Sequence, residues 1–151
     1  MTSTTTPTVH ASAVLVGPRA VLIRGPSGAG KSRLALALLA AAQDGQIPFA
    51  RLVSDDRSRL EAHHGRLLVR PAAELAGLIE MRGLGIQRLA HEPVAVVGLV
   101  VDLAAADAER LPVDNGRRAV LAGIEVARLA VAPGADPLPI VLAALTAKPV
   151  R

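Results

Sequence analysis

Gly25-Pro26-Ser27-Gly28-Ala29-Gly30-Lys31-Ser32 completes the pattern G-x-x-x-x-G-K-[ST]. The apolar, largely β-branched run Val21-Leu22-Ile23 precedes it, and a run rich in leucine and alanine, residues 34–42, follows it. This order predicts a strand, a glycine-rich loop and a helix. Backbone N–H groups at the start of such a helix bind phosphate, because the helix dipole favours negative charge there. The sequence therefore predicts a polyphosphate-binding site.

Several side chains in and after this loop suit a nucleoside triphosphate with a metal ion. In such loops the lysine, here Lys31, reaches the β- and γ-phosphates, and the hydroxyl of Ser32 binds Mg²⁺. Leu52-Val53-Ser54 predicts a strand whose carboxyl end delivers Asp55 and Asp56 beside the loop. A carboxylate can join Ser32 at Mg²⁺, and either aspartate can act as general base. Both acids reach the site only if the strand breaks there, because adjacent residues on a regular strand point to opposite faces.

The composition narrows the class of protein. The 151 residues suffice for one domain, and the net charge of +4 comes from dispersed arginines rather than a basic stripe. Phe49 is the only aromatic residue, so a stacking platform for nucleic-acid bases is missing. No apolar stretch approaches the ~20 residues that cross a bilayer. We find neither a signal segment nor a cysteine. These features favour a cytoplasmic protein without a nucleic-acid or membrane partner.

The alternation of strand and helix patterns predicts an α/β fold, namely a P-loop mononucleotide-binding domain with a mainly parallel sheet and an antiparallel edge. We expect a flexible tail at residues 1–9 and a single domain at residues 10–151. His10 is expected just ahead of the first strand. The expected strands are residues 13–16, 20–24, 52–54, 94–103 and 124–131, with a hairpin of 59–62 and 67–70 and helices at 31–42, 104–110 and 138–147.

Ile79-Glu80-Met81-Arg82-Gly83-Leu84-Gly85-Ile86 resembles the (L/I)E(I/V)RG(L/I)GI signature of bacterial HPr kinase/phosphorylase. The resemblance begins at His10, fifteen residues before the first loop glycine, and continues in matching order through the loop and Val53-Ser54-Asp55-Asp56 to about Arg110. It is to the short form of the family, which lacks the N-terminal domain. It implies an enzyme that uses ATP and Mg²⁺ to phosphorylate a serine of HPr, a small phosphocarrier protein of the sugar phosphotransferase system. It also implies the reverse phosphorolysis.

The resemblance further implies roles for individual residues. The catalytic residues would be His10, Lys31, Asp56 and Arg110. The magnesium ligands would be Ser32 and Glu80, beside the carboxylate of Asp55. In the forward direction, Asp56 would take the seryl proton, and Lys31 would stabilise the transferring phosphoryl group. Because family members form hexamers, a homo-oligomer is expected.

Two alternative functions stay open at this point. One is a P-loop kinase with another protein or a small metabolite as acceptor, and the other is a non-catalytic ATP-sensing module. Retention of Lys31, Asp56 and Glu80 argues against the module, because a pure binder needs no base. One loop departs from the family: Pro133-Gly134-Ala135-Asp136 lacks the arginine of the PGRN segment that is associated with dephosphorylation. This difference argues against phosphorylase activity.

Overall fold

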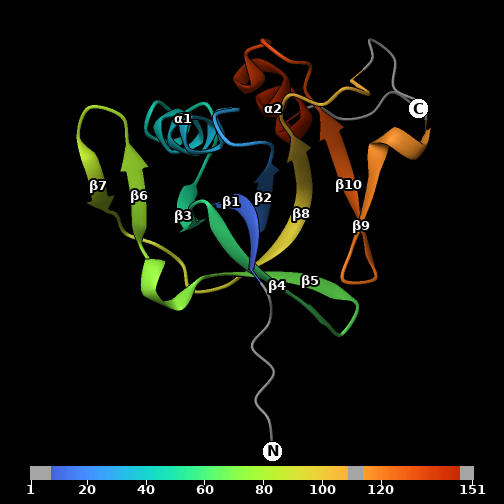
Figure 1. Cartoon of the computed structure of the whole chain (residues 1–151), viewed down its shortest axis with the longest axis horizontal. Coiled ribbons are helices and arrows are strands. Elements are labelled where there is room, and N and C mark those ends of the chain that lie inside the picture. The colour runs from blue at the N-terminus through green and yellow to red at the C-terminus, as the bar shows by residue number, and fades with distance from the viewer. Residues whose placement is uncertain (1–7, 109–113, 147–151) are drawn as a thin grey trace, which may run out of the picture.

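The computed structural model describes residues 8–108 and 114–146 (Figure 1). The strands are β1 (Thr8–Val16), β2 (Arg19–Arg24), β3 (Ala50–Ser54), β4 (Arg57–His63), β5 (Arg66–Pro71), β6 (Leu78–Met81), β7 (Gly85–Arg88), β8 (Ala95–Asp102), β9 (Arg118–Leu121) and β10 (Ile124–Ala130). The helices are α1 (Lys31–Gln43) and α2 (Pro137–Thr146), with short 3-10 helices η1 (Ala73–Leu75) and η2 (Asp114–Arg117). Within the described ranges, no helix combines the length and the apolar character that a bilayer crossing requires.

The main sheet is mixed and closes on itself. Its order is β2-β1-β4-β5-β8-β10-β9, and β8 also pairs with β2, so that β2, β1, β4, β5 and β8 form a small ring. Of the nine strand pairings among the described strands, seven are antiparallel and only β2·β8 and β8·β10 are parallel. The expected mainly parallel sheet is therefore wrong, although the α/β class and the hairpin β4–β5 are confirmed.

The sheet is mainly antiparallel because of the chain segment that connects β2 to β8. A parallel connection needs a crossover of a dozen or more residues, usually a helix. Only α1 is a long helix in this stretch, and the rest of the chain there forms hairpins, β4–β5 in the ring and β6–β7 beside it. In Figure 1 both helices lie at the top of the view, toward which the arrowheads of β2, β8 and β10 also point. The parallel pairing is thus confined to β2, β8 and β10, whose carboxyl ends lie toward the helices.

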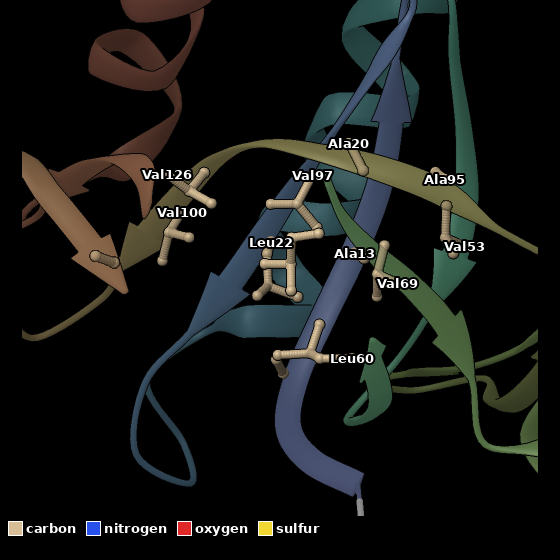
Figure 2. Close-up of a cluster of buried hydrophobic side chains, with 13 residues drawn as sticks. Ala13, Ala20, Leu22, Val53, Leu60, Val69, Ala95, Val97, Val100 and Val126 are labelled. Atoms are coloured by element: carbon tan, nitrogen blue, oxygen red, sulfur yellow. The ribbon is translucent and has the colours of Figure 1, made fainter. Parts of the chain in front are cut away.

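The core consists of two apolar clusters on opposite sides of β2. Ala20 and Leu22 belong to the cluster inside the ring (Figure 2), whereas Val21 and Ile23 belong to the cluster under the helices. This division follows the two-residue period of a strand. The inside of a narrow ring has room for small side chains, and it holds the buried alanines Ala11, Ala13, Ala20 and Ala95. The alanine-rich, almost aromatic-free composition therefore fits this core.

The structure changes the expected position of His10. Strand β1 begins at Thr8, so His10 lies inside the strand rather than ahead of it. Thr8 and Val9, which were expected in the tail, pair with β4. The start of β1 gave no local signal for a strand, because its partners Arg59 and Ser58 lie about 50 residues away.

The helix expected at residues 104–110 is wrong in its described part. Residues 104–108 form turns, and Ala104 adopts a left-handed backbone with φ +52°. The N–H of Ala105 donates to the carbonyl of Val131 at 2.9 Å, so this stretch is held against the end of β10. Alanine favours a helix locally, but such tertiary contacts override a weak propensity.

Candidate active site

The P-loop lies between β2 and α1. Gly28 and Gly30 have φ values of +82° and +101°, which glycine adopts without steric cost. A Cβ on Gly25 would lie 3.1 Å from the Cβ of Leu103, so the loop packs closely against the end of β8. Gly30 is the N-cap of α1, and no side chain caps this helix. No side-chain cap therefore occupies its first backbone N–H groups, which suits phosphate binding.

Lys31 is folded over this loop. Its Nζ donates to the carbonyl oxygens of Gly25 at 2.9 Å and Pro26 at 3.3 Å. The residue is only 8% exposed, although it carries a charge. A buried ammonium at the mouth of a helix N-terminus, held by two carbonyl oxygens, is suited to exchange these contacts for phosphate oxygens.

Asp55 connects the loop to the rest of the site. Strand β3 ends at Ser54, and the next residue places its carboxylate against α1. Its Oδ1 accepts hydrogen bonds from the hydroxyls of Ser32 at 2.7 Å and Ser12 at 2.8 Å. Its Oδ2 accepts from the backbone N–H of Glu80 at 3.2 Å. One buried carboxylate thus joins β1, α1 and β6.

Asp56 occupies a break between two strands. Its φ is +66°, and the N–H of Arg57 donates to the carbonyl of Asp55 at 2.7 Å, which closes a three-residue γ-turn. Both β3 and β4 pair with β1, and Asp55–Asp56 separates them. This break is the condition under which both acids can reach one site. The side chain of Asp56 is exposed, whereas that of Asp55 is buried.

The other predicted catalytic and metal-binding residues have different outcomes. His10 is exposed in β1 and pairs with Arg57, directly beside the turn that carries Asp56. Glu80 is exposed in β6, and its backbone N–H contacts Asp55. The structure therefore brings these two residues to the acid turn. Arg110 lies outside the described residues.

The family model for the HPr serine kinase C-terminal domain matches residues 2–148. The chain belongs to the HPr serine kinase C-terminal domain family. A solved structure, the Hpr(Ser) kinase/phosphatase from Coxiella burnetii, is similar to it with a TM-score of 0.72 and 25% sequence identity, covering 92% of this chain and 88% of that one. A search of curated proteins gave no match. The resemblance inferred from the signature segment is confirmed, and the domain is a protein-serine kinase of the HPr kinase family.

The residues present at this candidate site fit Mg²⁺-ATP. The glycine backbone and the uncapped start of α1 suit phosphate, and Lys31 supplies a positive charge. Magnesium in kinases takes one or two carboxylates, and the nucleotide phosphates complete its coordination. The hydroxyl of Ser32 and the carboxylate of Asp55, 2.7 Å apart, are oxygen donors of this kind. Among the described residues, no group of three or more histidine, cysteine, aspartate or glutamate side chains is arranged to hold a metal ion by itself.

A cluster of charges near the P-loop was not predicted. Arg24, the residue before the loop, donates from Nε and Nη2 to Asp102 at 2.7 and 2.8 Å. Arg128 donates from Nε to the same carboxylate at 2.5 Å and contacts Asp107 and the carbonyl of Gly116. Burial alone raises the pKa of Asp102, but the hydrogen bonds from Arg24 and Arg128 outweigh it and hold the pKa below its usual value. The cluster ties together the carboxyl ends of β2, β8 and β10.

A second residue that was missed is Ser12. It is fully buried in β1, and its hydroxyl contacts both acids of the turn. The available signal was a serine between Ala11 and Ala13, just ahead of the apolar run Val14-Leu15-Val16. A buried hydroxyl must find hydrogen-bond partners, so its position there indicates a polar contact inside the fold.

Proposed function

We propose that this domain transfers the terminal phosphoryl group of Mg²⁺-ATP to a seryl hydroxyl of an HPr-type phosphocarrier protein. The observation that carries the proposal is the hydrogen bond from Ser32 to Asp55, which joins the phosphate-binding loop to the acid turn 23 residues away. Family membership indicates HPr as the acceptor. The contact holds Asp55, and with it the neighbouring Asp56, next to the proposed nucleotide site.

Nucleotide binding is assigned to the loop. The backbone N–H groups of residues 27–32 and the ammonium of Lys31 would hold the β- and γ-phosphates. Ser32 and Asp55 would hold Mg²⁺, together with Glu80, whose backbone already contacts Asp55. Bound Mg²⁺ would neutralise the charge that develops on the phosphate oxygens. These residues therefore bind and orient the phosphoryl donor.

Proton transfer is assigned to the turn. As the seryl oxygen bonds to the γ-phosphorus and the bond from that phosphorus to the β,γ-bridging oxygen breaks, the carboxylate of Asp56 would accept the seryl proton. The exposure of Asp56 supports this role, because an acceptor protein must reach it from solvent. His10 would assist from the neighbouring strand, and Arg110 would stabilise the transferring group.

The same proposal includes the state in which the domain works. It would act in the cytoplasm as a homo-oligomer, with residues 10–151 as one kinase domain and without a nucleic-acid or membrane partner. Phosphorolysis of phosphoseryl-HPr is not included, because Ala135 stands where the family has the arginine of its dephosphorylation loop.

The experiment combines purified protein, HPr from the same organism, ATP and Mg²⁺, and locates the phosphate by mass spectrometry. Phosphoserine on HPr that is lost with Lys31→Ala would support the proposal. Bound ATP without phosphoserine would contradict it. A phosphate on a different added protein or metabolite would instead favour the kinase with another acceptor, and binding without any transfer would favour the ATP sensor.

A further inference from the structure

One hydroxyl group in the structure touches both acids of the turn. The Oγ of Ser12 donates to Oδ1 of Asp55 at 2.8 Å and accepts from the backbone N–H of Asp56 at 3.1 Å. Ser12 lies in β1 and is 0% exposed, so water does not compete for these bonds. The three residues are brought together across more than 40 positions of the chain.

The contact to Asp56 supports a backbone conformation that is costly for this residue. A non-glycine residue with positive φ is strained, although aspartate tolerates the left-handed region better than most. Strand β1 holds Asp56 on both sides, since the N–H of Ala11 donates to the Asp56 carbonyl at 3.1 Å while Ser12 accepts from its N–H. Such strain persists only where the surroundings over-determine it.

The contact to Asp55 restrains a carboxylate that also accepts a hydrogen bond from Ser32 of the P-loop. Ser12 and Ser32 both donate to Oδ1, and the backbone of Glu80 donates to Oδ2. Ser12 therefore limits rotation of the Asp55 carboxylate from strand β1, in addition to the contact from α1. The same buried hydroxyl thus contacts the carboxylate of Asp55 and the backbone of Asp56.

We infer that Ser12 is a positioning residue, which sets the orientation of Asp55 and the turn conformation of Asp56 for phosphoryl transfer. The inference rests on the proposed function. Its physical basis is that a proton acceptor and a donor-orienting group must lie within a narrow geometry, so that a displacement of 1 Å can cost about 100-fold in rate. Removal of the hydroxyl leaves the Asp56 N–H unpaired and releases the Asp55 carboxylate on one side.

Ser58 offers a matched control in the same region. It is also 0% exposed, its Oγ donates to the carbonyl of Ala11 at 2.8 Å, and it lies 2.6 Å from the hydroxyl of Ser54. It contacts neither Asp55 nor Asp56 through its side chain. Ser58→Ala thus removes a buried hydroxyl of similar structural weight without touching the acids.

The test compares Ser12→Ala and Ser58→Ala by steady-state kinetics, ATP binding and thermal unfolding. Both variants should lose similar thermal stability. Only Ser12→Ala should lower kcat, by about 10- to 100-fold, while the Kd for ATP stays within about threefold because the loop is intact. An unchanged kcat for Ser12→Ala, or an equal loss in Ser58→Ala, would overturn the inference.

A double-mutant cycle distinguishes positioning from a structural role. If Ser12 acts through Asp56, then Ser12→Ala should barely change the residual rate of the Asp56→Asn variant, so the two losses are not additive. Fully additive losses would contradict the inference. Absence of transfer by the wild-type protein would instead contradict the proposed function. Crystal structures give a readout independent of activity: Asp56 should leave positive φ, or its carboxyl should become disordered, in Ser12→Ala and not in Ser58→Ala.

Discussion

The P-loop and the acid turn lie side by side but obtain their geometry differently. The loop, residues 25–30, is shaped by its own glycines and by a turn from the carbonyl of Pro26 to the N–H of Ala29 at 3.0 Å. The acid turn has no glycine, and its contacts come from distant residues, among them Ser12, 43 residues before Asp55, Ser32, 23 residues before it, and Glu80, 25 residues after it. The loop is thus a local structure, whereas the turn depends on the assembled fold.

This difference implies a division of function that mutations can test. Changes in the loop should act first on nucleotide affinity, because we propose that its backbone N–H groups bind phosphate. Changes in the turn should act on the rate of transfer, because the turn positions the proposed base and the proposed metal-binding carboxylate. A variant that mixes the two effects would show that loop and turn are coupled.

The largest effect is expected for Asp56→Asn. An amide cannot accept the seryl proton, so kcat for HPr phosphorylation should fall by about 1,000-fold or more. The backbone φ should be retained, because asparagine tolerates positive φ as aspartate does. Isothermal titration with Mg²⁺-ATP should show nearly unchanged affinity. Retained turnover would remove Asp56 from the role of base.

A large effect on stability, without one on affinity, is expected for Asp102→Asn. This change leaves the partly exposed Arg24 without a carboxylate partner and the largely buried Arg128 with only Asp107. Because two charged hydrogen-bonded contacts are lost, the free energy of unfolding should fall by about 3 kcal/mol. Urea unfolding measures this loss, and Glu125→Gln is the control. Its partner Arg118, at 3.0 Å, is exposed, so the control should lose less than about 1 kcal/mol.

The pH dependence of this loss has a definite sign. The folded-state pKa of Asp102 is lowered, so its stabilisation is present above the unfolded pKa of about 3.9 and disappears as the pH falls through the folded pKa. The difference in unfolding free energy between wild type and Asp102→Asn should therefore be constant from pH 7 to about pH 5 and shrink below about pH 4. A difference that grows in acid would contradict the assigned cause. A large loss of ATP affinity in Asp102→Asn at pH 7 would contradict the local character of the loop.

A smaller effect is expected for Gly28→Ala. A Cβ there meets nothing within 4 Å, so the cost is the strain of positive φ, about 1–2 kcal/mol. Because the strained peptide is one that we propose to bind phosphate, ATP affinity should fall by about tenfold. Gly17→Ala in the β1–β2 turn is the control, with φ +59° and equally open space. It should lose similar stability and keep ATP affinity, and equal losses of affinity in both variants would show a global effect.

The contrast between local and long-range structure also explains what could be predicted from the sequence. The loop, helix α1 and the β4–β5 hairpin follow from neighbouring residues, and the structure confirms them. The proximity of Asp55 to Ser32 was predicted from a strand end. The ring closure between β2 and β8 was not, because both strands are apolar and nothing in either specifies its partner. We predicted a mainly parallel sheet because we interpreted each element separately, without knowing which strands pair, and this prediction was wrong.

The same limit applies to individual residues. Arg24 and Asp102 each end an apolar strand, and Ser12 lies between two alanines in β1, but their contacts depend on strand register. The turns at residues 104–108 replace a helix that alanine composition favoured, because hydrogen bonds to the end of β10 decide this stretch. Residues whose role depends on distant partners were therefore the ones that sequence reasoning missed.

The most direct test of the central claim is a single-turnover, rapid-quench measurement with ATP labelled in the γ-phosphate, Mg²⁺ and HPr. We predict that the label moves in one exponential phase into acid-stable phosphoserine on HPr, and that Lys31→Ala shows no such transfer. Label that appears only as inorganic phosphate, or bound ATP that never loses its label, would contradict the claim that loop and turn together form a serine kinase site.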